Sequence, residues 1–488
     1  MSPLLILGWI GGYFLFLLGI AWYTSRRATN DAYFLGNRQS PWYAVAFGMI
    51  GDSLSGVTFI SVPGAVGQTK FAYLQVVLGY VLGYAVIAYV LLPLYYRLQL
   101  TSIYTYLHGR FGPCTQKTGS AFFILSRTLG AAARLYLAGS VLQVFVFDAW
   151  GVPFWLSVAV VILLMLAYTY KGGIKTLVWT DTFQSTFLLL GVILSIVAIA
   201  GSLKLGLRDL VATVWNSPHS QAFFWEWREA GNFWKQFVGG AFIAIVMTGL
   251  DQNMMQKNLS CRSLREAQVN MMSFSLVVVL VNLFFLSLGV LLYAYAQARG
   301  IEIPAKTDQL FPLLALQHLG TFAAVVFVLG LTAATFSSAD SVLTTLTTSF
   351  CIDILGMETQ SGMTESRKTH LRHVVHLAFA AILLFTILLF KAVGASAVIN
   401  AVLKLANFTY GPLLGLFAFG LCSRWRVQDR LVPAICLLPP VICYLLDANS
   451  RAWFGNYSFG NELLILNGLL TCVCLLCVRE TDRGGSPA

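Results

Sequence analysis

A polar hexapeptide, Gly51-Asp52-Ser53-Leu54-Ser55-Gly56, interrupts an otherwise apolar stretch of the chain over residues 44–67. Glycine loosens a helical hydrogen-bond ladder and serine can bond the freed backbone groups, so the segment predicts a helix that is unwound in its middle. Unwound backbone at membrane depth is tolerated only where protein buries it or where it lines a cavity. Its bare carbonyl oxygens can then coordinate a cation, which indicates ion-coupled transport.

Two adjacent hydroxyls, those of Ser337 and Ser338, lie on another long apolar stretch. Sodium is a hard cation that prefers about five or six oxygen ligands, and carbonyls and hydroxyls suit it. Adding three carbonyls to the two hydroxyls predicts a main sodium site. Its ligands are Gly51, Leu54, Ala334, Ser337 and Ser338. The alternative is that the serines bond back to their own helix four residues earlier.

Carboxylates inside apolar stretches are costly unless they meet a partner or a cavity. Asp181, Asp340 and Ser341 are candidates for a second cation site. Lys404, buried in another stretch, is a candidate ion-pair partner of Asp340, and Asp52 beside the predicted break could take part in coupling. Three interpretations stay open: a second sodium ion, a structural ion pair such as Asp340–Lys404, or proton coupling.

Arg134 lies in the middle of the stretch 118–148. Its planar guanidinium matches a carboxylate bidentately, so a carboxylate-bearing solute would compensate its charge. Pairing with Asp52 or another buried aspartate is the alternative. We expect Arg127, two turns earlier, to snorkel to the cytoplasmic end. Other residues expected to line the solute pocket are Gln75, Phe242, Thr248 and Asp251.

The composition is that of a membrane protein. Hydrophobic residues make up 58% of the 488 and charged residues 10%, against about 25% charged in soluble domains. Runs long enough to cross about 30 Å of hydrocarbon recur about thirteen times, which predicts an all-α integral membrane protein with no separate soluble domain. The runs are 3–23, 42–68, 72–97, 118–148, 152–170, 174–202, 232–256, 271–298, 320–352, 373–390, 394–421, 430–446 and 460–478.

Basic residues predict the orientation. With the N-terminus outside, 19 of the 31 Lys and Arg residues, Lys257 among them, fall on the cytoplasmic side. This satisfies the positive-inside rule with the C-terminus in the cytoplasm. The net charge of +11 therefore reflects topology rather than nucleic-acid binding.

Two blocks of five spans, 42–202 and 232–421, can be matched in order, and each begins with a helix that is polar in its middle. Because each block holds an odd number of spans, the second must be inverted relative to the first. We expect five units: an anchor helix with a cytoplasmic loop (1–41), the first repeat (42–202), an extracellular loop (203–231), the second repeat (232–421), and two C-terminal helices with a tail (422–488).

Four segments resemble the sodium/solute symporter family, in the order that family shows. They are Thr101–Leu107 with Arg110-Phe111-Gly112; Gly172–Thr176 with Trp179-Thr180-Asp181 and Gln184; Gly249-Leu250-Asp251-Gln252 with Gln256-Lys257; and Ser337-Ser338 ahead of Asp353 and Ile354. Lys257 stands where the family usually has arginine. The resemblance covers roughly residues 35–420.

The resemblance implies a leucine-transporter-like inverted-repeat fold, with broken first and sixth core helices, and sodium-coupled uptake. It implies that the five main-site ligands bind sodium. Some members bind a second sodium with the residue matching Asp181 and with hydroxyls on the helix of Ser337, but here Asp340 replaces one hydroxyl. In sialic-acid members an arginine matching Arg134 holds the carboxylate. Ser53, Ser55 and Thr58 match hydroxyls near that substrate.

We therefore expect a sodium-coupled symporter that imports a small polar solute, bearing a carboxylate such as that of a sugar acid, by alternating access. The alternatives are a proton-coupled or ion-independent carrier of the same fold and a solute sensor without flux. We do not expect an enzyme, because the sequence shows no nucleophile–base pair, phosphate loop or metal-ligand cluster. The expected partners are sodium, the solute and the lipid bilayer, with no nucleic acid, and the expected state is a functional monomer in the plasma membrane.

Overall fold

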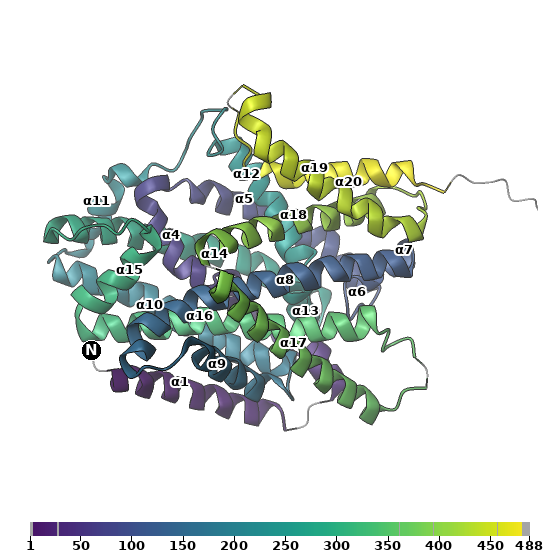
Figure 1. The fold of residues 1–488 in the computed structure, drawn as a ribbon, viewed down its shortest axis with the longest axis horizontal. Helices are drawn as coiled ribbons and strands as arrows, with labels where there is room; N and C mark the ends of the chain where they lie inside the picture. Colours follow the sequence, from purple (N-terminus) through teal and green to yellow (C-terminus); the bar gives the residue numbers. More distant parts are fainter. Residues whose placement is uncertain (1–2, 27–28, 361, 394, 456, 481–488) are drawn as a thin grey trace, which may run out of the picture.

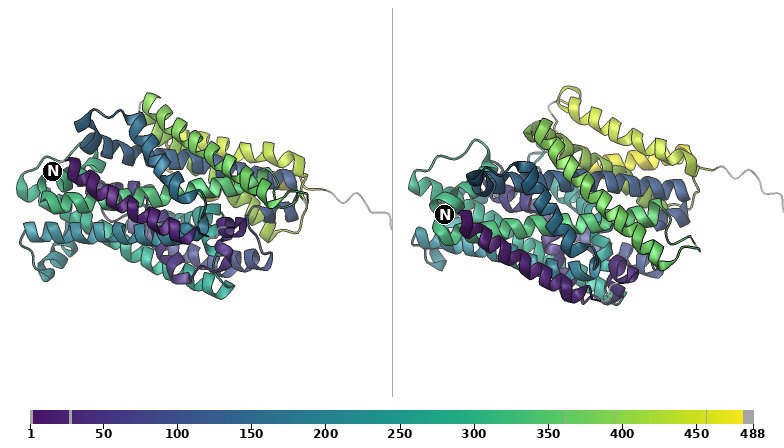
Figure 2. Two further views of the ribbon diagram at one scale, coloured as in Figure 1. Left: turned by 90° about the horizontal axis from the view of Figure 1, so that it is seen from below. Right: turned by 60° about the horizontal axis from the view of Figure 1, so that its bottom comes forward.

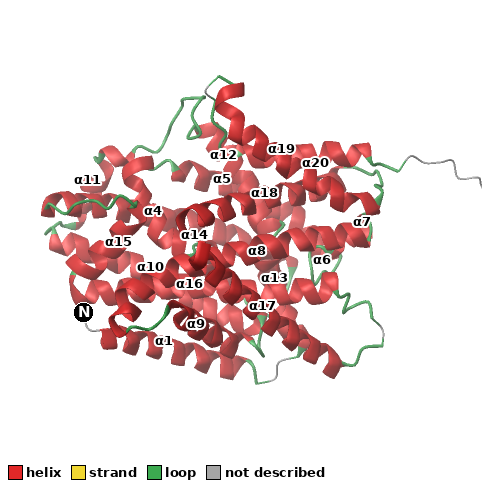
Figure 3. Cartoon of the chain, viewed as in Figure 1, coloured by secondary structure: helices red, strands yellow, loops and turns green. Residues whose placement is uncertain are grey.

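The computed structural model describes residues 3–26, 29–360, 362–393, 395–455 and 457–480. Over these residues the regular elements are helices, and β pairing is limited to two isolated bridges (Figure 3). The first half contains α1 (Pro3–Thr24), α2 (Asn30–Leu35), α3 (Trp42–Ser53), α4 (Gly56–Thr69), α5 (Tyr73–Val86), α6 (Leu92–Arg97), α7 (Thr105–Arg110), α8 (Pro113–Leu142), α9 (Phe154–Thr169) and α10 (Ile174–Ser202).

The second half contains α11 (Leu207–Trp215), α12 (Phe233–Ala244), α13 (Gln252–Leu259), α14 (Leu264–Arg299), α15 (Leu310–Leu313), α16 (Gly320–Ser349), α17 (Glu365–Val393), α18 (Ala395–Cys422), α19 (Val432–Trp453) and α20 (Glu462–Cys477). Short π-helical turns extend several of them, including η2 (Ile87–Leu91), η3 (Gln143–Phe147), η6 (Ile245–Gly249) and η9 (Phe350–Ile354).

The membrane-spanning character of the chain is confirmed. Among the described residues, seven helices are long and apolar enough to cross a bilayer, or nine when each of two bent pairs counts as one span. Three shorter apolar helices add to these. Helix α8 is not among these helices, although its 30 residues would extend about 45 Å at 1.5 Å per residue. Its basic side chains lower its mean hydropathy. The total of about thirteen spans stays a prediction.

Helix α16 forms the centre of the bundle (Figure 1). In its most apolar segment of 18 residues, 83% of the residues are buried, and the helix packs against α10, α8 and α3. By contrast, only 22% of the residues in the most apolar segment of α1, and of α19, are buried. Helix α1 runs along the outside of the bundle (Figure 2). The serines and threonines of α16 from Thr332 to Ser349 are therefore held inside the protein rather than facing lipid.

Both predicted helix breaks are present. Helices α3 and α4 meet at 57° around Leu54 and Ser55, and α12 with η6 meets α13 at 64° around Leu250 and Asp251. The polar hexapeptide and the segment Met247–Gln252 are thus the places where these two spans unwind.

The loop before α7 supports the second break. The Gln252 side chain donates to the carbonyl of Thr101 (2.9 Å) and accepts from the backbone N–H of Ile103 (2.9 Å). The hydroxyls of Tyr95 and Tyr104 donate to the carbonyls of Gly249 (2.9 Å) and Leu250 (3.0 Å). Carbonyl groups released by this break are therefore satisfied by protein side chains, as the interior of a membrane protein requires.

Candidate functional site

The first break lies directly against the paired serines of α16. Leu54 (φ −104°, ψ 76°) and the extended Ser55 leave the helical region, so carbonyls near them leave the ladder. The approach to Ser337 is so close that a Cβ at Gly51 would collide with the Ser337 hydroxyl. The Gly51 N–H also donates to the hydroxyl of Ser185 on α10, at 3.0 Å. The fold thus brings together Gly51 and Ser337, two of the five predicted main-site residues.

The two serines differ in their hydrogen bonds. Ser337 does not bond back to its own helix, because its hydroxyl donates to Asp181 Oδ1 at 3.3 Å. Ser338 does, donating to the carbonyl of Thr335 at 3.1 Å. Each hydroxyl oxygen keeps lone pairs for a cation. Leu54 and Ala334 are also buried, and the five predicted ligands would offer oxygen atoms alone, the ligand type that suits sodium.

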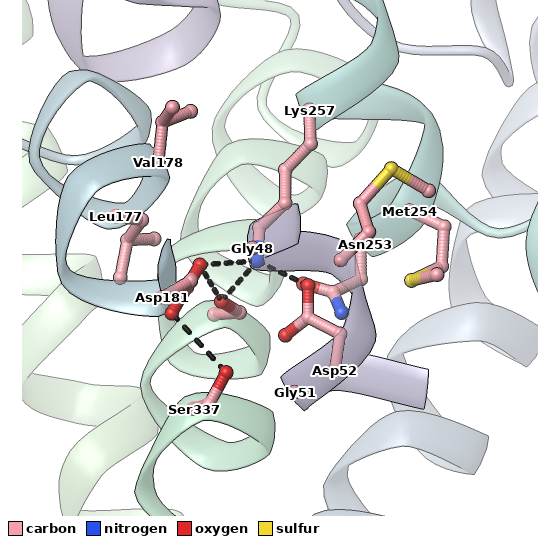
Figure 4. Close-up of polar contacts among 12 residues, drawn as sticks. Gly48, Gly51, Asp52, Leu177, Val178, Asp181, Asn253, Met254, Lys257 and Ser337 are labelled. Atoms are coloured by element: carbon pink, nitrogen blue, oxygen red, sulfur yellow. Dashed lines mark hydrogen bonds and ion pairs between the residues drawn. The ribbon is translucent and has the colours of Figure 1, made fainter. Parts of the chain in front are cut away.

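A lysine lies at the centre of the neighbouring acidic cluster (Figure 4). Lys257, on α13, donates from Nζ to Asp52 Oδ2, to Asp181 Oδ2 and, at 2.8 Å, to Ser341 Oγ. The side chains of Lys257, Asp52 and Asp181 are 1%, 0% and 0% exposed. These contacts join α3, α10, α13 and α16 through one ammonium group.

The Lys257 ammonium changes the interpretation of the second cation site. Asp181 and Ser341 already bind a cation, and it belongs to a side chain. Asp340 instead accepts a hydrogen bond from the hydroxyl of Tyr168, at 2.7 Å. The Lys404 side chain lies outside the described residues, so its predicted pairing with Asp340 stays a prediction. Charge counting predicts that Lys257 lies in a cytoplasmic loop, whereas the structure buries its side chain inside the protein, on α13.

A cavity of about 90 Å³ lies beside the first break. It is lined by Asp52, Ser53, Leu54, Tyr73, Tyr80, Tyr84, Arg127, Arg134, Ile243, Ala244, Met247, Thr248, Met254, Val278 and Asn282. Two buried acceptors on this lining, Asp52 Oδ1 and Asn282 Oδ1, have no hydrogen-bond partner among the described residues. Within the same part of the chain, the half-buried Arg134 guanidinium forms no ion pair or hydrogen bond.

The predicted solute-site residues separate into two groups. Ser53, Thr248 and Arg134 line the cavity together with Asp52. Ser55, Thr58, Gln75, Phe242 and Asp251 are not part of its lining. Gln75 instead holds the backbone of the loop before α12, donating to Gly231 and accepting from Phe224 at 3.0 and 3.2 Å.

Asp251 is engaged elsewhere. It caps α13 by accepting from the N–H of Met254 at 3.2 Å, and its other oxygen pairs with Arg127 Nε at 2.6 Å. The expectation that Arg127 snorkels is wrong, because its side chain is 8% exposed and meets this carboxylate inside the protein. Arg127 therefore borders the cavity as a cation neutralised by Asp251, whereas Arg134 borders it with no ion-pair partner among the residues that the structure describes.

Sequence reasoning missed several residues of this site. The family resemblance treats Lys257 as a replacement for arginine and charge counting treats it as a cytoplasmic residue, yet it follows a break and lies six positions after a buried aspartate, which is a signal for an internal cation. Asn282 and the three cavity tyrosines, Tyr73, Tyr80 and Tyr84, gave no comparable signal, because polar and aromatic residues are common in membrane helices.

Comparison with known proteins gives one answer. A model described as the sodium:solute symporter family matches residues 33–424. The sodium/sialic acid symporter of Proteus mirabilis is 24% identical over 467 residues, which are 93% of this chain and 92% of that protein. The sodium-coupled monocarboxylate transporter 1 of Mus musculus is 27% identical over 433 residues, which are 86% of this chain and 67% of that protein.

A solved structure of a Na⁺-coupled sialic acid symporter, in a substrate-bound outward-open state, matches with a TM-score of 0.82. Its sequence identity is 21%, and the match covers 97% of this chain and 98% of that one. The likeness confirms the predicted leucine-transporter-like fold. The chain therefore belongs to the sodium:solute symporter family, as a multi-pass membrane protein that couples sodium to solute transport and is not an enzyme.

Proposed function

We propose that this symporter carries a small carboxylate, with Arg134 holding the carboxylate group. The observation that carries the proposal is the contrast among three basic side chains near the first break. Arg127 and Lys257 are each paired with aspartate, whereas Arg134 borders the cavity and is unpaired within the described part of the chain. A guanidinium beside low-dielectric protein favours an anionic partner, and a carboxylate fits its fork.

The remaining polar groups of the cavity favour a solute that also donates hydrogen bonds. Asp52 Oδ1 and Asn282 Oδ1, which have no partner among the described residues, would each accept a hydrogen bond from a hydroxyl or N–H group of the solute. A cavity of about 90 Å³ is well below the roughly 300–1,000 Å³ of sites for drug-sized ligands. Short hydroxy-carboxylates fit it as it stands, whereas a sugar acid requires it to widen. The sialic acid and monocarboxylate carriers among the relatives support the carboxylate class.

The coupling ion in this proposal is one sodium ion bound by the backbone of Gly51, Leu54 and Ala334 and by the hydroxyls of Ser337 and Ser338. Support comes from the contact between Gly51 and Ser337 and from the burial of all five residues. The site lies next to Asp52, which also borders the cavity. Sodium bound there would fix the conformation of the break that shapes the solute site.

The broader architecture in this proposal has repeats over residues 42–202 and 232–421, flanked by the segments 1–41, 203–231 and 422–488. The N-terminus lies outside, the C-terminus lies in the cytoplasm, and the protein functions as a monomer in the plasma membrane. The distribution of Lys and Arg supports this orientation. Accessibility of an epitope tag at each terminus of intact cells tests it: the N-terminal tag should be labelled and the C-terminal tag should be labelled only after permeabilisation.

A thermal-shift panel on the purified protein tests the solute class. Ligand binding stabilises a protein by mass action, by about 2.7 kcal/mol at a concentration one hundred times the Kd. Lactate, glycerate and sialic acid should raise the melting temperature in sodium more than in choline, and lactamide should not. Stabilisation by neutral sugars or amines, with no response to any carboxylate, would contradict the proposal.

A further inference from the structure

Lys257 holds a position that a dissociable cation could otherwise fill. Its three ammonium protons are all used, on Asp52, Asp181 and Ser341. These oxygens come from three elements, the end of α3, the first third of α10 and the last third of α16. The lysine itself comes from α13, just after the second break. The ammonium thus binds oxygen ligands that converge on one point, as ligands of a metal cation do.

The charges of this cluster set how many further cations it needs. Asp52 and Asp181 contribute two negative charges and Lys257 one positive charge, and all three side chains are buried. One negative charge is left over, and burying a net charge is costly unless it is compensated. Asp181 Oδ1 accepts from Ser337, which is a ligand of the proposed sodium site. A single sodium ion at that site therefore neutralises the cluster.

The same cluster connects the sodium site with the solute cavity. Asp181 uses one oxygen for Ser337 and the other for Lys257. Asp52 uses Oδ2 for Lys257, and its Oδ1 is unpartnered among the described residues on the lining of the cavity. A continuous path of contacts therefore runs from the sodium ligand Ser337 through Asp181, Lys257 and Asp52 to the solute.

We propose that Lys257 serves as a built-in second cation, so that this carrier binds one sodium ion per transport cycle, and that it couples sodium binding to solute binding through Asp181 and Asp52. Lys257 is a positioning residue: it contacts neither ion nor solute, and it acts through the two carboxylates. The inference rests on the proposed sodium site.

Counting sodium ions tests the proposal independently of the solute. Binding of ²²Na⁺ to purified wild-type protein should saturate at one ion per chain with a Hill coefficient of one. Lys257→Ala removes the internal cation and leaves Asp52, Asp181 and Ser341 free to bind a second sodium ion, so the stoichiometry should rise to two and the Hill coefficient should exceed one. Lys257→Arg keeps the charge and should stay at one.

A second variant covers the case in which Lys257→Ala does not fold. Lys257→Ala/Asp52→Asn removes one carboxylate with the lysine, restores the cluster to a single negative charge and should bind one sodium ion. In the wild type, lactate should lower the sodium concentration for half-saturation about tenfold, and this double variant should lose that shift while it still binds one sodium ion. Two sodium ions per wild-type chain, or an unchanged lactate shift in Lys257→Ala/Asp52→Asn, would overturn the inference. Absence of sodium binding in the wild type would instead contradict the proposed sodium site.

Discussion

Replacing Arg134 separates recognition of the solute from stability of the fold. The guanidinium can make two charge-assisted hydrogen bonds to one carboxylate, each worth about 1.5–3 kcal/mol. Lysine keeps the charge and loses the fork, so Arg134→Lys should lose about one such bond. At 1.4 kcal/mol per factor of ten, affinity for lactate should fall about tenfold to one-hundredfold.

The structure also predicts what Arg134 variants will not do. Because Arg134 has no protein partner over the described residues, Arg134→Met leaves no anion behind, and the melting temperature without solute should not fall. Arg127→Met is the matched control on the same helix. This substitution leaves the fully buried carboxylate of Asp251 without its ion-pair partner and should destabilise the protein by about 3–5 kcal/mol.

The assay is isothermal titration of each variant with lactate and with lactamide in saturating sodium, alongside thermal melts without solute. The wild type should prefer lactate strongly, and Arg134→Met should bind the two compounds alike. An Arg134→Met protein that retains the preference for lactate would refute the assignment of the carboxylate to Arg134. An equally large loss of stability in Arg134→Met and Arg127→Met would show that Arg134 is structural.

Three further substitutions probe the ion site and its surroundings. Ser338→Ala removes one of about five ligands and should raise the sodium concentration for half-maximal uptake tenfold or more, or about 1.4 kcal/mol; an unchanged sodium dependence in this variant and in Ser337→Ala would exclude the site. Gly51→Val places a side chain against the Ser337 hydroxyl and should abolish sodium-dependent stabilisation in thermal melts, while normal sodium binding would show that the contact is not part of the site. Tyr168→Phe removes the hydrogen bond to Asp340 and should cost about 1–3 kcal/mol of stability with sodium stoichiometry unchanged; altered stoichiometry would return Asp340 to the ion site.

The fold was largely predictable because its signals are local. Apolar runs mark the helices, and the small and polar residues of Gly51–Gly56 and Met247–Gln252 mark both breaks, since each disturbs a helix through its own backbone and its nearest neighbours. The contact between Gly51 and Ser337 could be anticipated only through the family resemblance, because the two positions are far apart in the chain.

The partners of the buried charges were not predictable. Asp251 meets Arg127 across 124 positions, and Lys257 meets Asp52 across 205. Hydropathy and charge counting report the depth of a residue along a span, and they carry no information on which neighbouring helix faces it. Lys257 was therefore assigned to the cytoplasmic surface, although packing of α13 against α3 and α16 buries it.

Uptake driven by a sodium gradient in proteoliposomes tests the central claim most directly. With an inward sodium gradient and no proton gradient, ¹⁴C-lactate should accumulate above its external concentration, and collapse of the sodium gradient should release it. Ser338→Ala should require about tenfold more sodium for the same rate, consistent with a loss of about 1.4 kcal/mol. Accumulation that persists without a sodium gradient, or that follows an imposed proton gradient instead, would contradict sodium-coupled carboxylate symport.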